Sequence, residues 1–119
     1  MIKERVRLAT QEEVASIADS ADLTTASAVF AYDRGEGAPP ALAVGRLANE
    51  LDPVIFPEGI TDRQRYDFMR LLENHLRLAG VREYYFNIRV SDETWIKTVL
   101  VWGAQQQSRG PEFRFRKNL

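Results

Sequence analysis

The sequence predicts a mixed α/β domain of the α+β kind, in which a mostly antiparallel sheet is flanked by helices in the order β-α-β-β-β-α-β-α-β. Three observations lead to this prediction. Segments in which every second residue is apolar alternate with segments whose apolar residues recur every three to four positions. Two of the helical segments begin with a capping box, and Gly or Pro separates most of the segments. The length of 119 residues suits one domain, so residues 1–119 are expected to fold as a single unit.

The first part of the chain is expected to form a strand, a short helix and a hairpin. The strand is "IKERVRLAT", which begins at Ile2 and alternates apolar with polar residues. The helix is "TQEEVASIADSA", in which Thr10 and Glu13 have the spacing of a capping box. The hairpin consists of "ASAVFAYD" and "PALAVGRL", joined by the Gly- and Pro-rich turn "RGEGAPP".

The middle of the chain contains the best-defined predicted helix. It follows "LDPVIF", a short apolar strand whose Pro53 has no N–H and therefore belongs at a sheet edge, a bulge or a strand end. The helix runs from about Thr61 to Ala79. Thr61 and Gln64 form its capping box, and Gly80 supplies its stop.

The last part of the chain is expected to add two strands and a helix. "EYYFNIRV" is rich in β-prone residues, and one face carries Tyr84, Phe86, Ile88 and Val90. A helix from about Asp92 to Trp102 follows, with Ser91 as its cap and Gly103 as its stop. "EFRFRKN" then completes the sheet with its basic side facing water, or pairs across a dimer axis as a C-terminal edge strand.

Composition excludes several classes of function. Sixteen basic and seventeen acidic residues give a net charge of −1, so neither nucleic acid nor a membrane surface is an expected partner. The absence of cysteine excludes disulfides and thiolate catalysis, and no metal site is expected. The one histidine, His75, lies near the apolar face of the predicted central helix and is expected to be packed or half-buried rather than catalytic. No apolar stretch is long enough for a signal peptide or a membrane span, which predicts a cytoplasmic or otherwise intracellular protein.

A row of arginines follows the predicted central helix. Arg63, Arg70 and Arg77 recur at every seventh position, as a phosphate-binding row would. Asp67 and Glu73 lie within three or four positions of these arginines and supply counterions. The row is therefore interpreted as a solvated face with salt bridges.

Three segments resemble parts of the GCN5-related N-acetyltransferases (the GNAT superfamily). "VRLATQEEVASIA" resembles the opening strand and first helix of that family. "LDPVIFPEG…RLLENHLRLAGVREYYFNI" resembles its fourth strand, cofactor loop, third helix and fifth strand. "SDETWIKTVLVWGA" resembles its closing helix. The resemblance implies a small GNAT-like domain in which acetyl-CoA would lie between the fourth and fifth strands.

The positions that carry the chemistry of this family differ here. The family's phosphate loop has the pattern Gln/Arg-x-x-Gly-x-Gly/Ala, whose frame falls on "RQRYDF". Arg63 matches its first position, but Tyr66 and Phe68 replace the glycines, and their rings are expected to fill the space of the phosphates. The Tyr that protonates the departing thiolate in many members is replaced by Val99, and Trp95 replaces a small residue near the cofactor.

These departures favour a degenerate active site, with no catalytic residue and no bound cofactor. The domain would then act as a binding or structural module, with a protein partner or as a homo-oligomer. A component of a viral or mobile-element particle would fit this description.

The alternative is an active N-acetyltransferase that uses acetyl-CoA with an atypical loop. Its acid would be Tyr85 or a group not yet assigned, and its cofactor-binding residues would be Val54, Ile55, Phe56, Arg63 and Arg65. A third interpretation is a small-molecule binder that uses the cleft between the fourth and fifth strands, lined by Phe56 and Asn87.

Overall fold

The computed structural model describes residues 5–35, 37–46, 49–107 and 112–119, so Ile2 lies outside the described residues. The helices are α1 (Gln11–Ile17), α2 (Asp62–Leu78) and α3 (Glu93–Trp102). The strands are β1 (Arg5–Leu8), β2 (Ala26–Asp33), β3 (Ala41–Arg46), β4 (Glu50–Ile55), β5 (Glu83–Arg89), β6 (Gln105–Gln106) and β7 (Glu112–Asn118). The elements follow the order expected from the sequence, with the two-residue strand β6 added.

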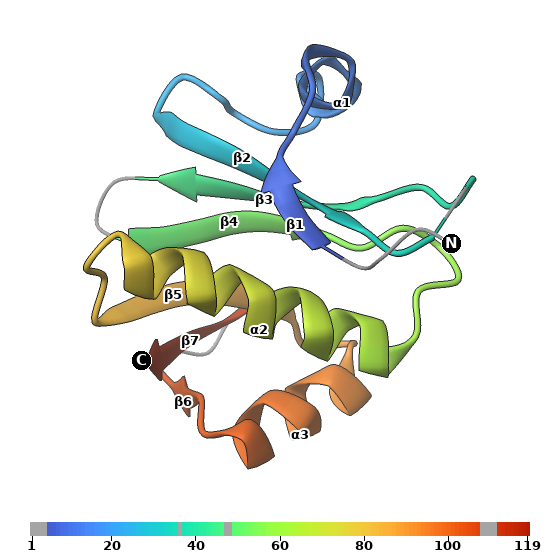
Figure 1. The fold of residues 1–119 in the computed structure, drawn as a ribbon. Helices are drawn as coiled ribbons and strands as arrows, with labels where there is room; N and C mark the ends of the chain where they lie inside the picture. The colour runs from blue at the N-terminus through green and yellow to red at the C-terminus, as the bar shows by residue number, and fades with distance from the viewer. Residues whose placement is uncertain (1–4, 36, 47–48, 108–111) are drawn as a thin grey trace.

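The described strands form one seven-stranded sheet in the order β1-β2-β3-β4-β5-β7-β6. Every neighbouring pair is antiparallel except β4 and β5, which are parallel. A parallel pair needs a crossover connection, and α2 supplies it by running across the sheet over β4 and β5 (Figure 1). The prediction of a mixed, mostly antiparallel sheet flanked by helices is confirmed.

The helices cover both faces of the sheet. Residues alternate between the faces along a strand, so Ala31 and Tyr32 of β2 mark opposite sides. Tyr32 belongs to the core cluster that contains the buried residues of α2 and α3, whereas Ala31 packs with Ile17 of α1. Thus α2 and α3 share one face, and α1 covers the other beside β1 and β2 (Figure 1).

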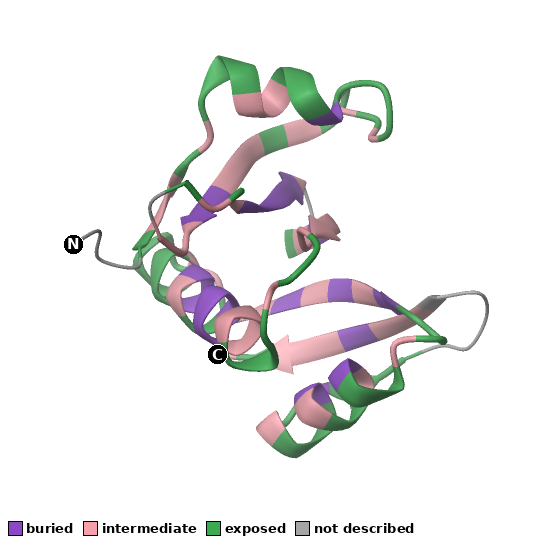
Figure 2. Ribbon diagram, turned by 90° about the vertical axis from the view of Figure 1, so that its right-hand side faces the viewer, coloured by how far each residue is buried: buried purple, intermediate pink, exposed green. Residues whose placement is uncertain are grey.

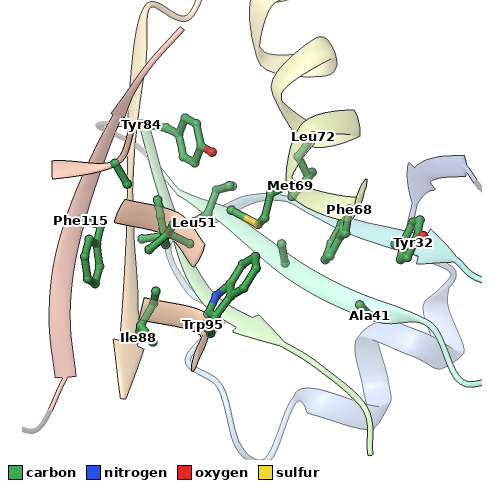
Figure 3. Packing of buried hydrophobic residues seen from close by; sticks show 14 residues of the cluster. Tyr32, Ala41, Leu51, Phe68, Met69, Leu72, Tyr84, Ile88, Trp95 and Phe115 are labelled. Carbon is green, nitrogen blue, oxygen red and sulfur yellow. The ribbon is translucent and has the colours of Figure 1, made fainter. Parts of the chain in front are cut away.

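The main core lies between α2, α3 and the sheet. Phe68, Met69 and Leu72 of α2 are almost fully buried, and the buried surface of the helix faces the strands (Figure 2). Met69 points towards Leu51 of β4 in Figure 3, with Trp95 of α3 nearby. Burial of an apolar side chain of this size contributes about 1.5–3 kcal/mol. The described part of the chain has no helix that is long and apolar enough to cross a membrane.

Both predicted capping boxes are present. At α2 the Thr61 hydroxyl accepts the Gln64 N–H, and the Gln64 side-chain oxygen accepts the Thr61 N–H, each at 3.1 Å. Thr10 and Glu13 repeat this arrangement at α1. The predicted cap of α3 is wrong: Asp92, not Ser91, is the N-cap residue, and its side chain makes no capping bond because it contacts another helix.

Pro53 occupies a bulge inside a central strand, one of the three positions predicted for it. Between the pairs Gly45↔Leu51 and Ala43↔Val54 the register of β3 and β4 shifts, so two β4 residues face one residue of β3. Arg46 Nε donates to the Asp52 carbonyl oxygen at 2.7 Å and holds the bulge from the neighbouring strand. A residue without an N–H suits this place because the ladder is already interrupted.

Strand β7 completes the sheet beside β5, as predicted, and the alternative of a C-terminal edge strand is wrong. It lies between β5 and β6, and β1 and β6 are the edges of the described sheet. Its basic side is also partly covered, since Arg114 lies 2.6 Å from a Glu50 carboxylate oxygen and 4.5 Å from the centre of the Tyr85 ring. Ion pairing and stacking therefore replace much of the water predicted around this side chain.

The predicted counterions of the arginine row are confirmed. Arg63 and Arg70 lie 3.2 and 4.0 Å from Asp67, and Arg77 lies 3.8 Å from Glu73. The two carboxylates are buried, so the row borders the core as well as the solvent.

Glu73 is the centre of a buried polar group that joins α2 to β5 and β7. Its side chain is 3% exposed, lies 3.5 Å from Lys117 Nζ and accepts a 2.9 Å hydrogen bond from the Tyr84 hydroxyl. Burial, and then the charge of Glu73, raises the pKa of Tyr84 well above its ordinary value. Tyr84 therefore remains a hydrogen-bond donor to Glu73 at neutral pH.

Replacing Glu73 by Ala is expected to destabilise the fold by about 3–5 kcal/mol, because Lys117 is then left without its buried partner. Urea unfolding measures this loss, with exposed Glu58→Ala as the control. Equal midpoints for the two variants would show that the buried group contributes nothing.

A second ionic group attaches α1 to the sheet. Arg7 of β1 donates to Glu13 of α1 at 2.7 Å and to Asp33 of β2 at 2.8 Å. The hydrogen bond from Arg7 lowers the pKa of Glu13 from 4.5 to about 2. A lowered carboxylate pKa stabilises the folded state above pH 4.5, and this contribution disappears as the pH falls towards 2.

Glu13→Gln is therefore expected to lose about 1.5–3 kcal/mol of stability at neutral pH. The difference from the wild type should shrink as the pH falls from 4.5 towards 2. Denaturant titrations at a series of pH values measure it, and a difference that stays constant through this range would contradict the assignment.

Candidate functional site

A cleft lies where β4 and β5 separate. The two strands pair only at Glu50↔Tyr85 and Leu51↔Phe86. Beyond these pairs a cleft of about 610 Å³ lies between them, which is within the range of small-molecule sites. It is lined by residues 52–56, 65, 69, 86–89, 91, 92 and 95.

The strand edges supply backbone hydrogen-bonding groups to this cleft. Val54 and Ile55 pair with β3 on the outer side of β4, and residues 87–89 pair with β7 on the outer side of β5. Alternate N–H and C=O groups of a strand point to its two sides. Because β4 and β5 no longer pair here, the described strands present donors and acceptors to the cleft from both sides.

Two arginines line the cleft, the partly buried Arg65 and the exposed Arg89. Arg65 Nη1 donates to an Asp92 carboxylate oxygen at 2.7 Å, and this ion pair connects α2 to the start of α3. The guanidinium carbon lies 4.8 Å from the centre of the Phe56 ring and 5.8 Å from the Trp95 ring. Its Nε is buried and has no hydrogen-bond partner among the described residues.

The cleft brings together four of the five residues predicted for the cofactor in the alternative interpretation. Val54, Ile55, Phe56 and Arg65 line it. Arg63 does not, since its side chain is 81% exposed and bonds to Asp67 on the outer surface of α2. One residue of sequence separates Arg63 from Arg65, which in a helix corresponds to a turn of about 200° about the axis.

The residues proposed for the third interpretation also lie at the cleft, whereas the candidate acid does not. Phe56 and Asn87 both line it. Tyr85 occurs on the other face of β5 from buried Phe86, and its hydroxyl donates to Glu83 at 3.2 Å. Tyr85 is not among the residues that line the cleft.

Tyr66 and Phe68 lie within helix α2 and do not line the cleft. The helix begins at Asp62, before the two glycine positions of the family pattern. Tyr66 and Phe68 are therefore helical residues, and the helix sets the directions of their side chains. Phe68 is fully buried and stacks on Tyr32 with ring centres 5.3 Å apart. Tyr66 meets Trp102 edge to face at 5.5 Å. Neither ring lines the cleft, and the capping box engages the N–H groups of Thr61 and Gln64.

The remaining predicted positions have structural surroundings. Val99 is fully buried in the main core, while Trp95 lines the cleft. His75 is exposed, 6.1 Å from the Phe30 ring, so the prediction of a half-buried histidine is wrong. No group of three or more potential ligands among the described His, Asp and Glu residues is placed to hold a metal.

Several cleft residues were not predicted. Met69, Ser91 and Asp92 line the cleft, and Asp92 pairs with a residue 27 positions earlier in the sequence. No local pattern indicates such a pair. The one available signal was an acidic residue at the start of a predicted helix, and it was not predicted to take part in a site.

In comparisons with known proteins, no family model and no curated protein matches this chain.

Proposed function

We propose that this chain is an acetyltransferase-like domain that has lost acetyl-CoA binding and acts as a binding module through the cleft between β4 and β5. Two features agree with the GNAT resemblance of the sequence. A long helix connects a parallel strand pair, and this pair separates after two positions. A binding function fits the open cleft, and the following contacts argue against acetyl transfer.

The observation that carries the proposal is the capped N-terminal end of α2. A phosphate-binding helix end needs free N–H groups and a close approach of the backbone. Here the Thr61 hydroxyl accepts the Gln64 N–H, and the Gln64 side chain accepts the Thr61 N–H. The positions that are glycine in the family carry Tyr66 and the buried Phe68. The capping box and these two side chains make this helix end unlike the phosphate site of the family.

The position of the family's proton donor supports the same conclusion. Val99 has no proton to donate, and its side chain is fully buried in the core. The acidic residues at the cleft are Asp52 and Asp92, and Asp92 is engaged by Arg65. General acid catalysis requires a group within hydrogen-bond reach of the leaving atom.

One observation favours the alternative function, an active N-acetyltransferase. Val54, Ile55, Phe56 and Arg65 line one continuous cleft, so a pantetheine chain and a phosphate would find backbone groups and a cation there. This function requires Arg65 to exchange Asp92 for a phosphate.

The two functions are distinguished by calorimetric titration with acetyl-CoA and with free CoA, together with an assay for CoA thiol release in the presence of amines. We expect no binding heat up to about millimolar ligand and no thiol release. Binding at about micromolar strength, near −8 kcal/mol, would contradict the proposal. If that binding falls at least tenfold in Arg65→Ala but not in the exposed control Arg63→Ala, the atypical cofactor site is established. Acetyl transfer to any amine would also contradict the proposal that acetyl-CoA binding has been lost.

A further inference from the structure

We propose that the cleft binds the carboxyl end of an extended peptide, with the peptide backbone between β4 and β5 and its terminal carboxylate on Arg65. This inference rests on the proposed binding function and names its ligand class. It follows from three properties of the cleft: two open strand edges, one incompletely paired arginine, and apolar walls.

The open strand edges select an extended, amide-bearing ligand. β4 and β5 stop pairing at Leu51 and Phe86, while their outer neighbours β3 and β7 continue. A peptide strand added at such an edge gains main-chain hydrogen bonds without depending on its sequence. The open edge of residues 53–56 accommodates about four residues at about 3.3 Å per residue. The volume of about 610 Å³ agrees with an occupant of this size.

Arg65 selects a carboxylate at the wide end of the cleft. A guanidinium binds a carboxylate best through two parallel N–H···O bonds, and Arg65 uses only Nη1 for Asp92. Its buried Nε has no partner in the described structure, and an unsatisfied buried donor destabilises the unbound state. Phe56 and Trp95 hold the guanidinium by their rings and reduce its freedom before a ligand arrives.

The position of Asp92 lowers the free-energy cost of replacing its carboxylate on Arg65 by the carboxylate of a peptide. Asp92 shows where a carboxylate sits against Arg65, and it is the N-cap residue of α3 without a capping bond. When the peptide carboxylate replaces it, the Asp92 side chain can accept an N–H from the first turn of α3. This capping bond offsets part of the lost ion pair.

The walls near Arg65 favour an apolar last residue in the peptide. Phe56 and Trp95 meet edge to face with ring centres 5.7 Å apart, and Met69 lies beside them in the lining. An apolar terminal side chain would bury its surface against these side chains.

The test uses the full chain and two pools of N-acetylated, random-sequence tetrapeptides. One pool ends in a free carboxylate and the other in a carboxamide. We expect the free-acid pool to shift the backbone NMR signals of residues 54–56 and 87–89, and the amide pool to bind at least tenfold more weakly. Individual peptides chosen for an apolar last residue then give dissociation constants.

Variants test the role of each charge. Arg65→Ala should weaken binding of the free-acid peptide at least tenfold, whereas exposed Arg63→Ala should leave it unchanged. Asp92→Asn removes the competing carboxylate and should tighten binding severalfold. Circular dichroism verifies that each variant is folded.

Two outcomes would overturn the inference: equal binding of the acid and amide pools, or no shift with either pool up to about millimolar peptide. Neither outcome bears on acetyl transfer, which is measured separately with acetyl-CoA. Acetyl transfer without peptide binding would overturn both proposals, and the absence of both activities would overturn this inference alone.

Discussion

The rest of the structure depends on the early end of the parallel pairing between β4 and β5. Only two residue pairs join these strands, at Leu51 with Phe86 and at Glu50 with Tyr85. The bulge at Pro53 turns β4 away from its neighbour, and Arg46 secures the bulge through the Asp52 carbonyl. α2 then bridges the two parts of the sheet, and the buried side chains of Met69 and Trp95 fill the space beneath the divergence. A pocket between two strand edges is the consequence.

The backbone and the side chains of this pocket suit different functions. The shape resembles a site for a long ligand that carries amide groups, because backbone donors and acceptors line both sides. Phe68 and Val99 have packing roles: Phe68 stacks on Tyr32, and Val99 is fully buried in the core. Arg65 lines this pocket as a partly buried cation, and it is paired with Asp92. Open strand edges together with Arg65 support binding through backbone pairing and one charge.

Features determined by neighbours in sequence could be predicted, and those determined by distant contacts could not. The capping boxes of α1 and α2 depend on residues three positions apart, so their spacing was sufficient. The sequence predicted Ser91 as the cap of α3, whereas Asp92 is the N-cap residue. The Asp92 side chain bonds to Arg65 of another helix, a contact that no local pattern shows. Likewise Arg63 and Arg65 lie on opposite sides of the predicted helix, but only the packing of α2 against the sheet determines which of them faces the cleft. Strand β6 is too short to have a periodic pattern.

Amide hydrogen exchange along β4 and β5 tests the central claim most directly, because the claim requires the edges of these strands to be open beyond Leu51 and Phe86. The account predicts strong protection of the inward amides at residues 50–51 and 85–86. Amides among residues 54–56 and 87–89 that face the cleft should exchange at least about tenfold faster, since water replaces a neighbouring strand. Uniform protection along both strands would contradict the account, because the strands would then be paired to their ends and no cleft would remain for a ligand.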